Sequence, residues 1–330
     1  MTTLRRRTVA LATALLSAAL ALTGCGSGPE ATPTETTSTI RSFEADNGPV
    51  EIPADPQRIV ALGSAQTYLA LGVEPVGLGP KASEADLPWL SAEEKRANDA
   101  AVDVGDPVDY EKVASLKPDL IVVSEPDHVL EGDKYDAERL RSIAPTVYFE
   151  VENSRWKTQT ERLADATGAL DTMKEGKAKY DALIAEIQDQ YGDLFDSTTF
   201  SFLNNWTGSA GEFAVEYAHS YCTAYATEAG LRILPDPPSE ELDGPGPSQS
   251  IEGLSDLAAS VDVLVYPLGA DREVNPKFKP TMGTNVWTSL PQVKDGRALG
   301  VRCNIGPTYA SKIGNLESLK EALSTLPGAE

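Results

Sequence analysis

The sequence is poor in the residue types on which nucleic-acid binding and bare-metal sites depend. It has 28 lysines and arginines against 50 aspartates and glutamates, a formal net charge of −22, and only two histidines, His128 and His219. A phosphate backbone attracts proteins that carry excess positive charge, so this balance argues against a nucleic-acid partner. Two histidines also fall short of the several His and carboxylate ligands that we expect of a bare-metal site.

Long apolar runs are equally scarce. The apolar run at 9–22 follows three arginines at 5–7 and is shorter than the roughly 20 residues that a membrane-spanning helix needs. A basic start followed by a short apolar run is typical of a secretion signal, which we place at residues 1–24. No later stretch is apolar enough to cross a membrane.

The residues at the end of this leader resemble the lipobox of bacterial lipoproteins. Leu22, Thr23 and Gly24 precede Cys25, which the resemblance makes the acylated first residue of the mature chain. Residues 26 to about 40 are rich in Gly, Ser, Pro, Thr and Glu, a composition that buries too little apolar surface to fold. We therefore interpret 25–40 as a lipidated cysteine with a disordered tether.

Cysteine is rare, with three in the chain. If Cys25 carries lipid, Cys222 and Cys303 remain, and in an oxidising compartment they could pair in a disulfide. The alternative is two separately buried thiols.

The sequence also lacks the usual signatures of catalysis. It has no Gly-x-Ser-x-Gly elbow, phosphate-binding glycine loop or metal-ligand cluster. Asp119 is one of a few acidic residues that could be imagined as an acid or base, but we interpret it as solvated. These absences favour a binding protein over an enzyme, and a protein-binding scaffold is a third alternative.

Apolar patterns alternate between strands and helices, which predicts an α/β fold with parallel sheets. Buried-strand runs occur at 59–62 and 120–123, and the alternation restarts at 200–203 and continues at 263–266. Between them, apolar residues recur with a helical period of 3.6. We expect an N-terminal lobe at 41–168, an interlobe helix at 169–195 and a C-terminal lobe at 196–330.

A weak internal repeat supports the two-lobe interpretation. Residues 111–123 and 252–266 both begin with a helix that starts at a glutamate and both end in a buried strand after an aspartate. Chance similarity between two helix-strand units is the alternative.

The chain resembles the helical-hinge (class III) periplasmic binding proteins, the substrate-binding lipoproteins of importers for iron-siderophores, haem and cobalamin. The resemblance rests on residues 56–62 (PQRIVAL), 71–77 (LGVEPVG), 111–123 and 143–147 (IAPTV), and more loosely on the region around Trp287. It implies two Rossmann-like lobes, an extracytoplasmic location on the cell membrane, no cofactor, and an ABC permease as partner.

In that family, one glutamate on each lobe contacts the permease. The matching residues here are Glu111 and Glu252. Widely separated carboxylates favour correct orientation on a two-fold partner. The alternative is that each glutamate only interacts with the dipole of its helix.

Ligands of open α/β lobes bind beyond the carboxyl ends of the strands, so the candidate ligand-binding residues follow the strand runs. Aromatic and guanidinium groups suit a bulky iron chelate. The candidates in the first lobe are Gly63, Ser64, Gln66, Trp89 and the segment from Ser124 to His128. Those in the second lobe are Asn204, Asn205, Trp206, Tyr266, Arg272, Arg302 and Tyr309.

We expect an iron-siderophore complex as the ligand, with haem or cobalamin as alternatives. The haem alternative depends on His128, since histidine is a common ligand of haem iron. The choice between hydroxamate and catecholate siderophores stays open.

Overall fold

The computed structural model describes residues 39–126, 134–151, 155–238 and 244–327. The predicted signal, Cys25 and His128 lie outside these residues, as does nearly all of the predicted tether. No helix in the described part of the chain has both the length and the apolar character needed to cross a membrane.

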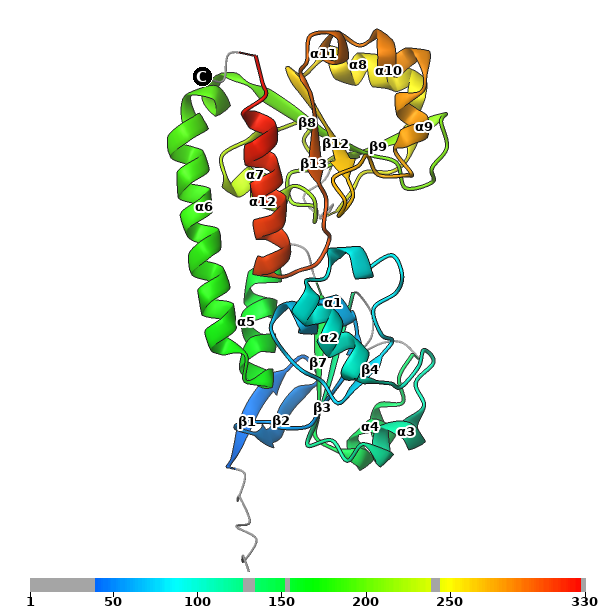
Figure 1. Ribbon diagram of the computed structural model, residues 1–330, viewed down its shortest axis with the longest axis vertical. Coiled ribbons are helices and arrows are strands. Elements are labelled where there is room, and N and C mark those ends of the chain that lie inside the picture. Colours follow the sequence, from blue (N-terminus) through cyan, green and yellow to red (C-terminus); the bar gives the residue numbers. More distant parts are fainter. Residues whose placement is uncertain (1–38, 127–133, 152–154, 239–243, 328–330) are drawn as a thin grey trace, which may run out of the picture. The chain divides into compact units, whose positions relative to one another are not determined.

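The first sheet has five parallel strands and lies in the lower half of the molecule as drawn in Figure 1. The consecutive apolar residues of its inner strands are buried on both faces. Its order places β3 and β6 side by side although they are not consecutive, which creates a switch point where the connections diverge. In spatial order the strands are β5 (Val102–Asp103), β4 (Gly77–Gly79), β3 (Ile59–Gly63), β6 (Leu120–Pro126) and β7 (Thr146–Val151).

Short helices connect these strands. They are α1 (Ala65–Ala70), a 3₁₀ turn at Leu87–Trp89, α2 (Ala92–Ala100), α3 (Tyr110–Ser115), α4 (Ala137–Ile143) and α5 (Trp156–Thr167).

An antiparallel hairpin, β1 (Ile40–Ala45) and β2 (Gly48–Pro53), precedes the sheet. The sequence patterns did not predict it, and the predicted tether, drawn to residue 40, runs one residue into it. The turn covers the open edge of β7, because Asp46 accepts a 2.8 Å hydrogen bond from the Glu150 amide and Asn47 bonds the backbone of Thr146 and Tyr148. Edge strands need such cover against unwanted pairing.

Helix α6 (Leu170–Ser197) has 28 residues and joins the two lobes. At 1.5 Å per residue it spans about 42 Å. Its buried residues include Tyr180, Ile187, Tyr191 and Phe195, which follow the predicted helical period. The observed bounds lie within two residues of the predicted 169–195.

The second sheet departs from the prediction of parallel sheets because it is mixed. Strands β10, β8, β12 and β13 run parallel, whereas β9 and β11 are antiparallel to their neighbours. The chain turns back after β8 without a crossover helix, so β9 can only pair antiparallel. The strands are β8 (Thr199–Asn204), β9 (Glu212–Glu216), β10 (Arg232–Ile233), β11 (Gln249–Ser250), β12 (Val263–Leu268) and β13 (Ala298–Arg302).

The helices of the second lobe are α7 (Ala224–Glu228), a 3₁₀ turn at Ile251–Gly253, α8 (Leu254–Ala259), α9 (Lys279–Met282), α10 (Asn285–Ser289), α11 (Pro291–Lys294) and α12 (Tyr309–Leu323).

The two repeat units occupy equivalent places in the two sheets. Asp119, just before β6, accepts the backbone amides of Gln57 and Arg58 ahead of β3 at 2.7 and 2.9 Å. Asp262, just before β12, accepts the amide and hydroxyl of Thr199 at the start of β8 at 2.9 and 2.7 Å. These hydrogen bonds lower the pKa of Asp262. Each aspartate therefore braces the start of the neighbouring strand.

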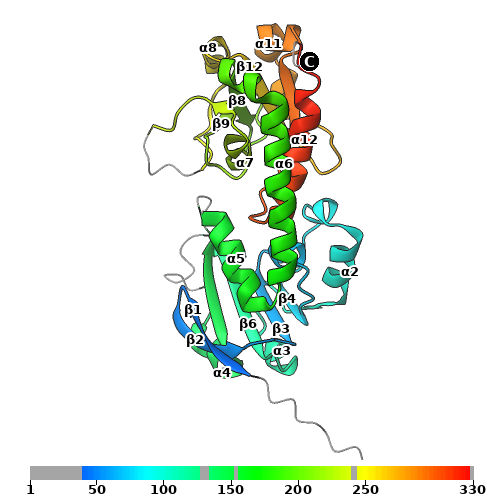
Figure 2. The same cartoon turned by 90° about the vertical axis from the view of Figure 1, so that its left-hand side faces the viewer.

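Helix α12 packs along α6 and places the end of the chain against the interlobe helix (Figure 2). At Gly176 a Cβ atom would lie 3.2 Å from the Cβ of Tyr309, so the missing side chain allows this close approach. Trp156, Tyr180 and Tyr309 form edge-to-face contacts with centroids 5.0 to 5.6 Å apart. A single hydrophobic cluster thus includes residues of both sheets, α6 and α12.

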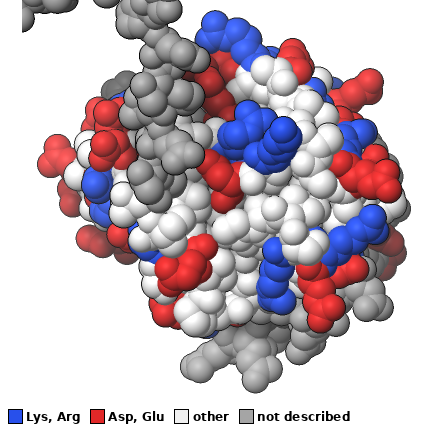
Figure 3. Space-filling model, turned by 90° about the horizontal axis from the view of Figure 1, so that it is seen from below, with Lys and Arg blue, Asp and Glu red and all other residues white. Residues whose placement is uncertain are grey.

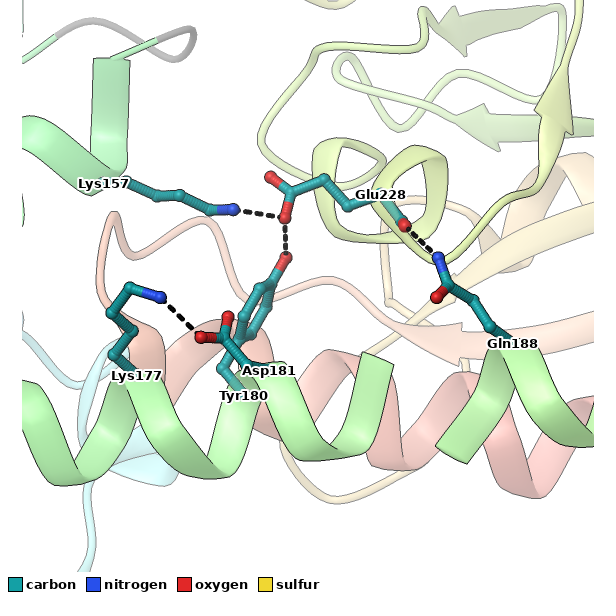
Figure 4. Close-up of polar contacts among 6 residues, drawn as sticks. All are labelled: Lys157, Lys177, Tyr180, Asp181, Gln188 and Glu228. Atoms are coloured by element: carbon teal, nitrogen blue, oxygen red, sulfur yellow. Dashed lines mark hydrogen bonds and ion pairs between the residues drawn. The ribbon is translucent and has the colours of Figure 1, made fainter. Parts of the chain in front are cut away.

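A polar network also ties α5 and α6 to α7 (Figure 4). Glu228 pairs with Lys157 and accepts a 2.7 Å hydrogen bond from the Tyr180 hydroxyl, while Gln188 donates to the Glu228 carbonyl at 3.0 Å. Burial, reinforced by the bond to Glu228, raises the pKa of Tyr180. The tyrosine therefore stays a neutral donor.

The surface of the first lobe seen in Figure 3 carries lysines and arginines interspersed with aspartates and glutamates around an uncharged area. This mixture differs from the clustered basic patch that a phosphate backbone attracts.

The substitution Ile187→Ala tests the dependence of the fold on α6. Ile187 is fully buried, so the change should lower the free energy of unfolding by about 2–5 kcal/mol through lost burial and a cavity. Urea denaturation measures the loss in free energy of unfolding.

Asp189→Ala is the control, because Asp189 is an exposed residue on the same helix. It should change the free energy of unfolding by less than about 0.5 kcal/mol. Equal effects of the two substitutions would contradict the proposed role of this packing.

Candidate functional site

A cavity of about 480 Å³ lies between residues of the two lobes. Its lining comes from segments that follow the carboxyl ends of strands, where open α/β sheets bind their ligands. The first lobe contributes Gln66, Ala85, Asp86 and Trp89, and the second contributes Asn204, Trp206, Asn275, Pro276, Lys277, Cys303, Asn304 and Ile305. A second hollow of about 400 Å³ shares Gln66, Trp89 and Asn304 with the first and adds Glu94 and Arg302.

The first wall is formed by the segment between β4 and α2. Asp86 accepts the amide and hydroxyl of Ser83 at 3.0 and 2.7 Å, which closes a turn ahead of the 3₁₀ turn that carries Trp89. Ser91 and Glu94 then form a capping box at the start of α2. Local hydrogen bonds therefore fix the tryptophan and both acidic side chains of this wall.

The second wall is formed by residues 302–305, at the end of β13, together with the loops that carry Trp206 and Lys277. The backbone of residues 302–304 is held by hydrogen bonds: Ser318 accepts the Arg302 amide at 3.0 Å and the Leu268 carbonyl accepts the Cys303 amide at 3.3 Å. Asn315 bonds both the amide and the carbonyl of Asn304, at 2.9 and 3.0 Å. The segment is a rigid support for the side chains that face the cavity.

A disulfide between Cys222 and Cys303 attaches the same segment to the loop after β9, with Cα atoms 5.1 Å apart. Cys222 is buried, whereas Cys303 lines the cavity. The pair closes a loop with a sequence separation of 81 residues. The cross-link therefore restrains the cavity wall as well as the unfolded chain.

Two contacts cross from one wall to the other. Gln66 donates from Nε2 to Oδ1 of Asn304 at 3.1 Å, and the Arg302 guanidinium lies 5.1 Å from the Trp89 ring centroid. An arginine over an aromatic face is attracted to the ring quadrupole. Each of these contacts contributes little free energy compared with the packing along α6.

Arg302 has an incompletely satisfied guanidinium. Its Nε is buried without a hydrogen-bond partner among the described residues, and partial burial lowers the pKa of the side chain. A buried donor without a partner costs free energy. The side chain as a whole is only partly buried and lines the hollow next to the cavity. Arg302 is therefore suited to bind an oxygen-rich ligand.

Exposed apolar groups gather on the second wall. Trp206 is 39% exposed and Ile305 is 54% exposed, and both line the cavity. Lys277 donates from Nζ to the Trp206 carbonyl at 3.0 Å, which positions the loop. Together with Trp89, these side chains present aromatic and aliphatic faces from opposite lobes.

Residues 59–261 match the family described as periplasmic binding protein. The chain belongs to this family. It is 30% identical over 300 residues to a protein of Bacillus subtilis (strain 168) named a probable siderophore-binding lipoprotein, covering 86% of this chain and 87% of that protein. An iron(3+)-hydroxamate-binding protein of the same organism is 27% identical over 320 residues, covering 94% and 95% of the two chains.

The fold agrees with that of solved structures. The siderophore periplasmic binding protein from the fuscachelin gene cluster of Thermobifida fusca superposes with a TM-score of 0.68 at 28% identity, covering 83% of this chain and 99% of that one. The predicted class of two-lobed α/β binding protein is thereby confirmed.

The structure brings five of the predicted ligand residues of this periplasmic binding protein together: Gln66, Trp89, Asn204 and Trp206 at the cavity, and Arg302 at the adjoining hollow. It does not bring Asn205 there. That side chain is fully buried and donates to Ser209, Glu212 and Thr281, so it holds its own loop. Its neighbour Asn204 lines the cavity instead.

Tyr309 is also buried, in the aromatic contact with Trp156 and Tyr180, and burial raises its pKa to about 12. Tyr266 stacks on Phe278, and Arg272 pairs with Glu321. Tyr266 and Arg272 line a different hollow in the second lobe. These three side chains do not line the cavity between the lobes. Position after a strand does not reveal which way a side chain points.

Sequence reasoning missed Asp86, Lys277, Asn304 and Ile305. Asp86 and Lys277 lie on loops several residues from a recognisable strand. Asn304 and Ile305 lie directly after β13, and their position next to the predicted Arg302 is a signal that could have found them. His128, on which the haem alternative depended, lies outside the described residues.

Proposed function

We propose that this periplasmic binding protein captures a ferric siderophore between its lobes and delivers it to an ABC permease. The observation that carries the proposal is the cavity between the lobes with its adjoining hollow, where the Arg302 guanidinium of one lobe lies 5.1 Å from the Trp89 ring centroid of the other. Relatives and structural neighbours named for siderophore binding support the same class of ligand.

In this proposal the ligand replaces the contacts that now cross between the walls. Trp89 and Trp206 would pack against the organic shell of the chelate, and Arg302, Asn304 and Gln66 would donate hydrogen bonds to its oxygens. No bond of the ligand is made or broken. The long continuous helix α6 resists a wide hinge motion, so capture would need only a small change in lobe angle.

Glu111 and Glu252 fit a role in docking to the permease. Both are exposed, Glu111 at the start of α3 and Glu252 at the turn before α8, in the equivalent repeat units of the two lobes. A carboxylate on each lobe would orient the protein on paired basic sites of the permease.

We also propose a location for the protein on the cell membrane. The leader and Cys25 would anchor the chain by lipid on the outer face of the cell membrane, where the Cys222–Cys303 disulfide would persist.

Binding is tested by tryptophan fluorescence during titration with a set of ferric siderophores. Trp156 and Trp287 are buried, so quenching should come mainly from Trp89 and Trp206. We expect saturable quenching, and a Kd at least about tenfold higher for Arg302→Gln, because a charge-assisted hydrogen bond is lost. Arg297→Gln serves as the matched control, because Arg297 lies just before the same strand, β13, but pairs with Asp295. Absence of quenching by every chelate would remove the proposed function.

Docking is tested by the double charge reversal Glu111→Lys and Glu252→Lys. Uptake of radiolabelled ferric siderophore by cells should fall roughly tenfold or more, because repulsion replaces attraction at the permease. The control reverses Glu138 and Asp256, which are also exposed acids in the first turn of a helix, one on each lobe. Equal uptake by the two double variants would refute the docking assignment.

Anchoring is tested by mass spectrometry of the mature protein from membranes. We expect an N-terminal peptide that begins at Cys25 and carries the added mass of acyl chains. An unmodified Cys25, or a chain that still begins at Met1, would contradict it.

A further inference from the structure

The charges around the cavity restrict the kind of iron chelate that it accepts. Four charged side chains line the cavity and the adjoining hollow: Asp86 and Glu94 on the first wall, and Lys277 and Arg302 on the second. Two negative and two positive charges cancel. The lining is therefore electroneutral, in a chain with a net charge of −22.

The four charges are also unevenly distributed and partly engaged. The first wall carries only the two acids, and the second carries the two bases. Lys277 donates to the Trp206 carbonyl, and Asp86 and Glu94 accept local hydrogen bonds from Ser83 and Ser91. The Arg302 guanidinium has a donor, Nε, without a partner among the described residues. The remaining surface is largely aromatic or aliphatic, from Trp89, Trp206, Pro276 and Ile305.

This arrangement disfavours a highly negative ligand. A ferric tris-catecholate carries excess negative charge, because each catecholate contributes two charges to one Fe(III). Enclosing it between the lobes would bring that charge against Asp86 and Glu94 with loss of water, and burial of unpaired like charges is costly. A ferric tris-hydroxamate is uncharged, because three singly charged groups balance Fe(III).

We infer that the cavity selects ferric chelates of low net charge, of the hydroxamate class, and that Asp86 and Glu94 reject more negative chelates. Apolar walls would pack against the ligand shell, and one guanidinium would satisfy a hydroxamate oxygen. Such discrimination uses a repulsive element as well as an attractive one. The inference rests on the proposed function, since it names the ligand class of that site.

Competing titrations with an uncharged ferric tris-hydroxamate and a ferric tris-catecholate test this inference. The hydroxamate should bind at least about tenfold more tightly. In the double variant Asp86→Asn and Glu94→Gln, the ratio of the two Kd values should fall severalfold, because the repulsion is removed while the shapes are kept. Glutamine also preserves the capping box with Ser91.

Glu93→Gln is the matched control, because Glu93 is an exposed neighbour on α2 that does not line either hollow. It should leave the ratio unchanged. Equal or tighter binding of the catecholate by the unsubstituted protein would overturn the inference and leave the proposed function standing. An unchanged ratio in the double variant would also overturn it. If neither chelate, nor any other ferric siderophore, bound, the proposed function itself would fail.

Discussion

The packing of α12 against α6 is the interaction on which the rest of this structure depends. Helix α6 follows α5 of the first lobe and is followed by β8 of the second sheet. Helix α12 packs along α6, and its Tyr309 contacts both Trp156 and Tyr180. Edge-to-face aromatic contacts and buried aliphatic residues make this seam continuous with the cores of both sheets. The carboxyl ends of the two sets of strands are thereby kept close enough to share a cavity.

The cavity combines a rigid wall with weak contacts across it. Residues 302–304 are held by Ser318, Asn315 and the disulfide, whereas Gln66 and Trp89 reach them through one hydrogen bond and one ring contact. A ligand can replace such contacts at low cost while it meets side chains that are already oriented. Preorganisation of this kind reduces the entropy lost on binding.

The internal repeat is a similarity of structure as well as of sequence. Asp119 and Asp262 each hold the start of a neighbouring strand. In each lobe the helix or turn before the aspartate carries an exposed glutamate in its first turn. Asp119, which could be imagined as a catalytic group, has its carboxylate engaged by two backbone amides. The same construction in both lobes places Glu111 and Glu252 at corresponding positions.

The sequence alone determined the α/β class, the two lobes and the interlobe helix, because hydrophobic periodicity reports local structure directly and α6 is long and strongly patterned. It also pointed to Trp89, Trp206 and Arg302. Only the tertiary structure decided the mixed second sheet, the hairpin on β7 and the lining by Asp86, Lys277 and Asn304. The tertiary structure also buries the side chains of Asn205 and Tyr309. These outcomes depend on contacts between residues far apart in the chain, which no local pattern encodes.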